Sequence, residues 1–148
     1  MRIACGVEVE ASPNRVWRFL VEPRLQKLWL AGVMDNVPED DGPLRPGKRS
    51  KMTIKGGRNL TDYDMTIDEV EPPTYLKLSM SGPTFPKPIG VEYRLTDFVN
   101  VTKLDYLATC DLPGLLKLFG PLVGSFARMQ VRSCLKTLKR LAESPEFE

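Results

Sequence analysis

Histidine is absent from this chain of 148 residues, and its absence excludes more chemistry than any other feature of the composition. Ser-His-Asp and Cys-His nucleophile systems cannot be assembled, and neither can a histidine-ligated zinc site. Cysteine is scarce, since Cys5, Cys110 and Cys134 lie far apart and form no C-x-x-C pair. We therefore expect no disulfide framework, no metal site and no bound cofactor, and three buried thiols that act as small apolar side chains.

Long apolar runs are missing as well. No stretch approaches the 18 apolar residues of a transmembrane helix, and the N-terminus lacks the apolar core of a signal peptide. Neither sign of charge dominates, because 21 basic and 19 acidic side chains give a net charge of +2. This balance does not indicate a nucleic acid partner, and no glycine-rich phosphate loop is present. We expect a cytoplasmic protein.

What the chain does contain is typical of one globular domain spanning residues 1–148. Hydrophobic residues make up 42% and charged residues 27% of the sequence. A chain of this length buries about 68–70% of the surface of its unfolded state, so it can form a hydrophobic core without disulfides or metal ions.

Apolar and polar residues alternate over most of the chain, which predicts strands. After a first strand over residues 3–9, Ser12-Pro13 marks the start of a short helix, Glu22-Pro23 ends it, and a second short helix covers 24–30. Val70 is out of phase with its strand, which predicts a bulge. The further strands are predicted over residues 32–37, 48–55, 60–71, 75–81, 91–95 and 104–110.

The period changes near the C-terminus, where apolar residues recur at helical spacing from Leu115 to Glu143. Consecutive strands joined by short turns are antiparallel, and one long helix is available to cover them. We therefore expect an α+β fold in which a curved antiparallel sheet of about seven strands wraps around this helix. A gap between such a sheet and a single helix is a natural place for an apolar cavity.

Several motifs between residues 3 and 143 resemble those of the START-like superfamily, the SRPBCC or Bet v 1-like group that includes polyketide cyclases and dehydrases. The matching segments are Val7 to Leu20 with its Ser-Pro-x-x-Val-Trp helix start, Pro23, Trp29, Gly32-Val33, Glu69 to Pro73 with Tyr75-Leu76, and Leu138 to Glu143. The resemblance implies a helix-grip fold with an internal hydrophobic cavity. Members of the group bind lipids, sterols, quinones, polyketides or hormones, and some are cyclases, dehydratases or co-chaperones.

The apolar phases of the predicted elements supply the candidate cavity residues. From the strands these are Tyr63, Met65, Tyr93 and Tyr106, and from the long helix they are Phe119, Leu122, Val123, Phe126 and Met129. Trp29 is a candidate for the cavity mouth. Asp35 shares a phase with Val33, and an inward carboxylate there would act as an acid or base. For each of these positions, a plain core or solvent-facing role stays open.

Basic residues recur every four positions along the C-terminal helix, at Arg128, Arg132, Lys136 and Arg140. A solvated helix face accounts for this pattern, and contact with an anionic membrane surface is the alternative. Nucleic acid is disfavoured because no aromatic residues are interleaved with the charges.

Three functions are compatible with these residues. The first is a non-enzymatic carrier or sensor of a hydrophobic small molecule, such as a lipid, a quinone or a polyketide-like compound. The second is a cyclase or dehydratase of the polyketide type, and the third is a co-chaperone-like interaction module. The shortage of catalytic side chains favours the first.

Overall fold

The described residues of this computed structural model, 1–111 and 120–145, form strands and helices in the predicted order. The boundaries lie within a few residues of the sequence-based ones, and the predicted start of the last helix at Leu115 lies outside the described residues. The elements are β1 (Arg2–Val9), α1 (Pro13–Val21), α2 (Pro23–Trp29), β2 (Val33–Pro38), β3 (Arg49–Gly56), β4 (Asn59–Glu71), β5 (Tyr75–Ser81), β6 (Ile89–Phe98), β7 (Val101–Thr109) and α3 (Gly120–Ala142).

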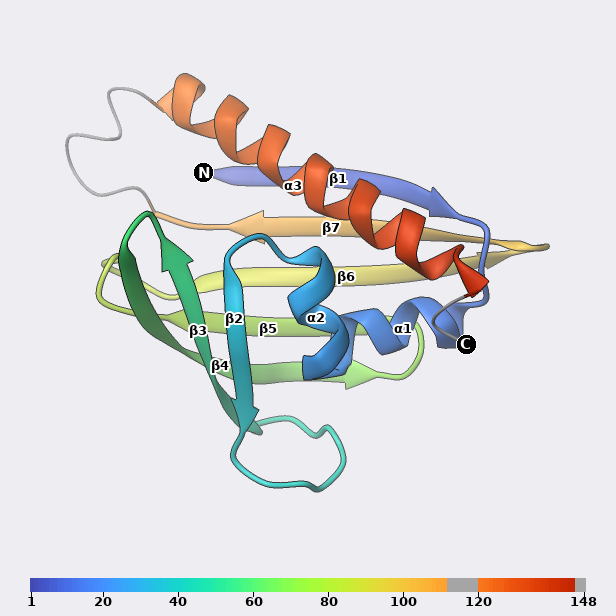
Figure 1. The fold of residues 1–148 in the computed structure, drawn as a ribbon, viewed down its shortest axis with the longest axis horizontal. Helices are drawn as coiled ribbons and strands as arrows, with labels where there is room; N and C mark the ends of the chain where they lie inside the picture. Colours follow the sequence, from blue (N-terminus) through green and yellow to red (C-terminus); the bar gives the residue numbers. More distant parts are fainter. Residues whose placement is uncertain (112–119, 146–148) are drawn as a thin grey trace.

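All seven strands pair antiparallel in one sheet with the order β1-β7-β6-β5-β4-β3-β2. The sheet is strongly curved, so that β2 and β3 run across the direction of β5 and β6 (Figure 1). The helix α3 packs along the edge strand β1, and α1 and α2 lie over the middle strands. This is the predicted helix-grip α+β fold.

Local signals fix the first helix and the end of the last one. The hydroxyl of Ser12 accepts a hydrogen bond from the backbone N–H of Arg15 (3.3 Å), as an N-cap does. The guanidinium of Arg15 in turn donates to the carbonyl oxygens of Ala142 and Ser144. Since the last carbonyls of a helix have no intrahelical partner, Arg15 ties the C-terminus of α3 to α1.

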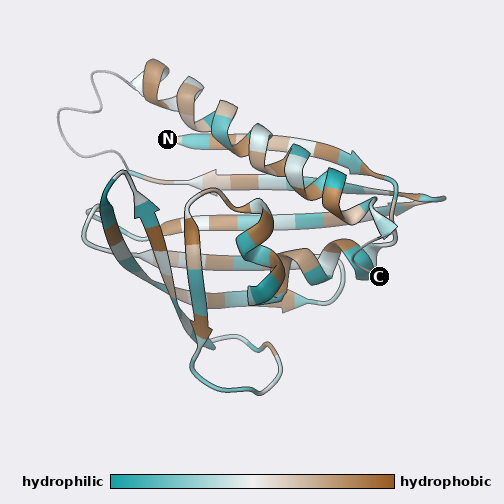
Figure 2. Ribbon diagram, viewed as in Figure 1, coloured by the Kyte–Doolittle hydropathy of each residue, from teal (hydrophilic) through white to brown (hydrophobic). Residues whose placement is uncertain are grey.

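The two halves of α3 differ in burial. In the C-terminal half, Leu135, Leu138 and Ala142 are enclosed in the core. In the N-terminal half, Leu122, Phe126 and Met129 are exposed by 71%, 66% and 61%, although apolar residues continue along this part of the helix (Figure 2). No helix among the described residues is long and apolar enough to cross a membrane.

Candidate functional site

The concave face of the sheet carries a cluster of three aromatic rings from three different elements. Trp29 of α2 meets Tyr93 of β6 edge to face, with ring centroids 6.3 Å apart, and Tyr93 meets Tyr106 of β7 in the same way at 5.5 Å. The indole N–H of Trp29 donates to the carbonyl oxygen of Phe19 (2.8 Å), which holds α2 over the cluster. Three predicted cavity residues are therefore brought together.

The hydroxyls of Tyr93 and Tyr106 form no hydrogen bond with any residue that the structure describes. Tyr93 is only 6% exposed and Tyr106 is half-buried, so both phenols lie within the fold, where the two rings pack against each other. Burial raises the pKa of Tyr93 well above its usual value and that of Tyr106 to about 12. Both remain protonated hydrogen-bond donors at neutral pH.

The three free cysteines lie around Tyr106, where their proximity adds to the rise in its pKa. Cys5 pairs with Tyr106 across the β1–β7 ladder, and Cys134 approaches from α3. All three are half-buried, whereas the sequence predicted buried thiols. The three thiols therefore place weakly polar, polarizable groups beside the ring of Tyr106.

Tyr63 and Met65 lie on the same face but outside the aromatic cluster. The Tyr63 hydroxyl is already bonded to Oγ1 of Thr84 (2.9 Å), and its ring packs against Phe85 at 6.1 Å between centroids. Gly82 lies directly on this ring, because a Cβ atom there would be 2.3 Å from it. Tyr63 thus packs beneath the β5–β6 loop, and Met65 is buried deeper along β4.

Asp35 does not point inward, contrary to the sequence-based expectation. Its side chain is 54% exposed and lies 3.5 Å from the ammonium of Lys27. The register of β2 against β3 shifts between Val33 and Asp35, so the strict alternation breaks at this point. Asn36, only 7% exposed, takes the inward position instead. Asp35 therefore supplies no acid or base to the inner face of the sheet.

Three residues of α3 that were predicted to line the cavity point away from the core. Leu122, Phe126 and Met129 lie on the opposite side of α3 from Leu135 and Leu138, which face the core. At 100° per residue the two sets point in opposing directions. With most of their surface exposed, the first three do not wall an enclosed space in this structure. Val123 is half-buried and Phe119 lies outside the described residues.

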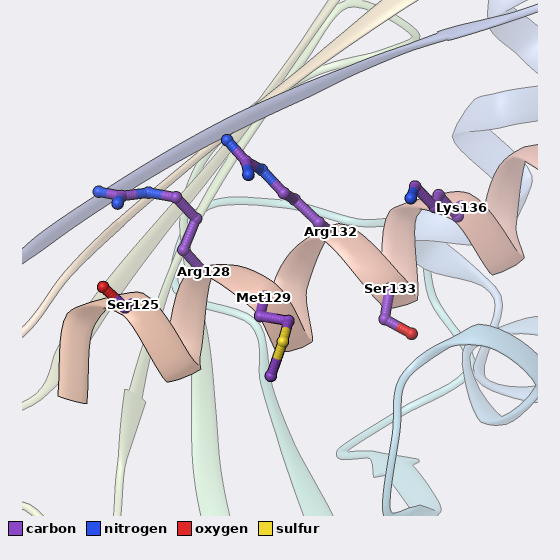
Figure 3. Close-up of a pocket in the computed structure, with 6 residues that line it drawn as sticks. All are labelled: Ser125, Arg128, Met129, Arg132, Ser133 and Lys136. Carbon is purple, nitrogen blue, oxygen red and sulfur yellow. The ribbon is translucent and has the colours of Figure 1, made fainter. Parts of the chain in front are cut away.

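The basic residues of α3 flank this exposed stripe. Figure 3 shows Arg128, Arg132 and Lys136 together on one side of the helix, with Met129 and Ser133 turned to the other. These residues and Ser125, all from α3, line an open hollow on the surface. Within 1–111 and 120–145, no carboxylate forms an ion pair with Arg128, Arg132, Lys136 or Arg140.

A pocket that the sequence did not predict lies beneath the α1–α2 junction, with a volume of about 440 Å³. Its lining includes the polar side chains of Gln26, Asn36 and Ser50 and the charged side chains of Glu22, Asp40, Asp41, Lys48 and Arg49. Asn36 at an inward position of β2 is the sequence signal that could have indicated this pocket. The bulge in β2 hid it, because the apparent alternation assigned Asp35 rather than Asn36 to the inner face.

Comparison with protein-family models matches residues 3–143 to the family described as "Polyketide cyclase / dehydrase and lipid transport". This chain belongs to that family. The match covers the same residues that carry the START-like motifs, so the predicted resemblance is confirmed. No curated protein matches the chain.

Solved structures share the fold of this polyketide cyclase / dehydrase family member at low identity. TTHA0849 from Thermus thermophilus is 16% identical with a TM-score of 0.76, and the match covers 96% of this chain and 97% of that one. Ara h 8.0201 is 11% identical with a TM-score of 0.70, at coverages of 96% and 97%. DynU16, from the dynemicin biosynthetic locus, is 20% identical with a TM-score of 0.71, at coverages of 99% and 48%.

Proposed function

We propose that this chain binds a hydrophobic small molecule between the sheet and α3, of a lipid, quinone or polyketide-like kind. The observation that carries the proposal is the pair of unpartnered hydroxyls, Tyr93 and Tyr106, on an apolar concave face of the described part of the chain. Two protonated donors beside apolar side chains suit a guest with a carbonyl or ether oxygen at one end. Family membership supports the same class of ligand.

Apolar contact would supply most of the affinity, and the phenols would orient the guest. Burying roughly 200 Å² of apolar ligand surface contributes about 5 kcal/mol before the costs of association. Each phenol hydrogen bond adds about 1 kcal/mol. Binding is favoured over cyclase or dehydratase chemistry, because Asp35 lies exposed and paired with Lys27. We also retain the cytoplasm as the proposed compartment.

The double variant Tyr93→Phe/Tyr106→Phe is expected to bind fluorenone, an apolar tricyclic ketone, about thirtyfold more weakly than the parent chain. Fluorene has the same shape without the carbonyl oxygen, so its dissociation constant is expected to change by less than about twofold. Isothermal titration or fluorescence quenching measures both constants.

Tyr63→Phe is the matched control, since it removes a hydroxyl from the same face that is already bonded to Thr84. This variant should bind both compounds as the parent does. Equal weakening of fluorenone binding in the control and in the double variant would refute the role given to Tyr93 and Tyr106.

We further propose that the chain contacts anionic membranes through the first half of α3. Leu122, Phe126 and Met129 expose a stripe of apolar surface. Arg128 and Lys136 flank it with positive charge (Figure 3). An apolar stripe beside cations that no described carboxylate pairs is typical of helices that lie in the membrane interface. Such contact would bring a carrier of hydrophobic molecules to the membrane in which these molecules dissolve.

Vesicles of phosphatidylcholine with 30% phosphatidylglycerol are expected to sediment the parent chain. Since each basic residue near such a surface contributes about 1 kcal/mol, Arg128→Glu/Arg132→Glu/Lys136→Glu should reduce partitioning by two orders of magnitude or more. Phe126→Ser should reduce it without changing its salt dependence.

Reversal of Arg18, Arg24 and Lys27 on α1 and α2 changes the net charge equally and serves as the control. Retained binding in the α3 triple variant, or equal loss in the control, would contradict a membrane site on α3.

A further inference from the structure

One side of the pocket beneath the α1–α2 junction is formed by the connection between β2 and β3, residues 39–48, which is the long loop beyond the ends of these strands in Figure 1. The pocket residues of this connection are Asp40, Asp41, Gly42, Leu44 and Lys48. Met65 and Leu78, which also line the pocket, are only 8% and 7% exposed. The connection therefore borders a buried part of the inner face of the sheet.

The middle of this connection is held to the rest of the fold by few contacts. Its ends are fixed, since the N–H of Glu39 donates to the carbonyl oxygen of Arg49 (3.0 Å) and that of Gly47 to the carbonyl oxygen of Ile67 (2.7 Å). Between these two anchors, no backbone–backbone hydrogen bond among the described residues joins residues 40–46 to another segment, and six of these seven residues are exposed. Gly47 adopts a φ of +88°, a left-handed conformation that favours glycine and suits a hinge. A segment with exposed backbone and few apolar contacts opens more readily than a core strand.

Polar contacts centred on Asp40 and Lys48 hold the middle of the connection in place. The backbone of Lys48 is fixed to β4, because its carbonyl oxygen accepts the N–H of Ile67 (2.9 Å). The side chain of Lys48 is only 7% exposed, and its ammonium donates to the carbonyl oxygen of Gly42 (2.5 Å) and lies 3.5 Å from the carboxylate of Asp40. That carboxylate also pairs with Arg45 at 2.6 Å and accepts the N–H of Gly42 at 2.9 Å, and both contacts lower the pKa of Asp40 below its usual range. Both partners of the buried Lys48 ammonium thus belong to the loop.

We propose that residues 39–47 form a hinged flap on the pocket beneath the α1–α2 junction, latched by Asp40 and Lys48, and that its opening admits small molecules to the inner face of β4. Leu44 of the flap is half-buried against the core and lines the pocket, so it leaves the pocket when the flap opens. The latch consists of ion pairs that lie largely at the surface, so it is easily broken and weakened by salt. This flap goes beyond the guest site beneath α3, because none of the three residues of the aromatic cluster is among the described residues that line this pocket.

The rate at which N-ethylmaleimide labels a buried thiol in the pocket measures the opening of the flap. In Met65→Cys the new thiol lies in the pocket, and Cys5, Cys110 and Cys134 serve as references in the same mass spectra. Adding Asp40→Asn, which removes the charge and keeps the shape, is expected to raise the labelling rate at position 65 about fivefold and to leave the three reference rates unchanged. About 1 M NaCl should raise the rate at position 65 in Met65→Cys alone, and should have no effect once Asp40→Asn is present.

Asp41→Asn is the matched control, because it removes the same charge from the neighbouring flap residue, which forms no ion pair with any residue that the structure describes. It should leave the rate at position 65 as it is in Met65→Cys alone. Lys48→Met breaks the latch from its other side and should accelerate labelling as Asp40→Asn does, which keeps the test decisive should Asp40→Asn fold poorly. Leu78→Cys places a thiol in the same pocket from β5 and replaces Met65→Cys if that variant is unstable.

Equal labelling rates with Asp40→Asn and with Asp41→Asn would overturn the flap. Equal acceleration of the reference thiols would also overturn it, because the whole fold would then be opening. Either result would leave the guest site beneath α3 untouched, since that site is tested by the binding of fluorenone.

Discussion

Replacing Leu138 with alanine is expected to destabilise the fold by about 2–5 kcal/mol, the usual cost of a large-to-small change in a closed core. Leu138 is fully buried on the last turns of α3, where the helix packs against the sheet and Arg15 holds its end. Chemical denaturation followed by circular dichroism measures the loss.

Leu122→Ala is the matched control, because it is the same substitution on the same helix at a position that is mostly exposed. Its effect is expected to stay within about 0.5 kcal/mol. The two halves of α3 should thus differ several-fold in their contribution to stability. A large loss at Leu122, or a small one at Leu138, would show that α3 presents a different face to the sheet.

Alkaline pH is expected to destabilise the chain through Tyr106, by about 2 kcal/mol between pH 10 and pH 12. Its pKa is about 12 in the folded state, mainly because of burial, and about 10 when unfolded. Above pH 10 the unfolded state releases this proton while the folded state keeps it, so the free energy of unfolding falls as pH rises. Below pH 10 both states are protonated and the contribution vanishes. Tyr93 acts in the same direction.

Urea unfolding of the parent chain and of Tyr106→Phe at pH 8 and pH 11.5 measures this contribution. At pH 8 the two proteins should agree within about 0.5 kcal/mol, since the hydroxyl has no partner to lose among the described residues. At pH 11.5 Tyr106→Phe should be the more stable by about 2 kcal/mol. The same difference at both pH values would mean that the phenol does not titrate as a buried group.

Most of the fold was predictable because its signals are local. Ser12-Pro13 starts α1 and Glu22-Pro23 separates it from α2, as the sequence predicted. The out-of-phase Val70 indicated the bulge, and the register of β4 against β5 does shift between Ile67 and Glu69. A residue that breaks a long alternation is visible in a strand of 13 residues.

The bulge in β2 was not predictable, because an inserted residue is visible only against a long alternation and β2 is short. A strand of six residues offers too few alternations to reveal an inserted residue, so Asp35 was assigned to the wrong face and Asn36 was missed. On α3 the apolar residues occupy two opposite sides, and periodicity alone does not state which side the sheet covers. Only the structure therefore shows that Leu122, Phe126 and Met129 lie on the exposed side of α3.

The central claim, a guest held beneath α3 with its oxygen at two phenols, is tested most directly by nuclear magnetic resonance of the four tyrosines. With ¹³C-labelled tyrosine rings and fluorenone as the guest, the signals of Tyr93 and Tyr106 are expected to shift together and saturate with one binding constant. The signals of Tyr63, which is bonded to Thr84, and of Tyr75, which is bonded to Glu92, should stay unchanged. Saturable shifts at Tyr63 or Tyr75 without any at Tyr93 and Tyr106 would contradict the claim.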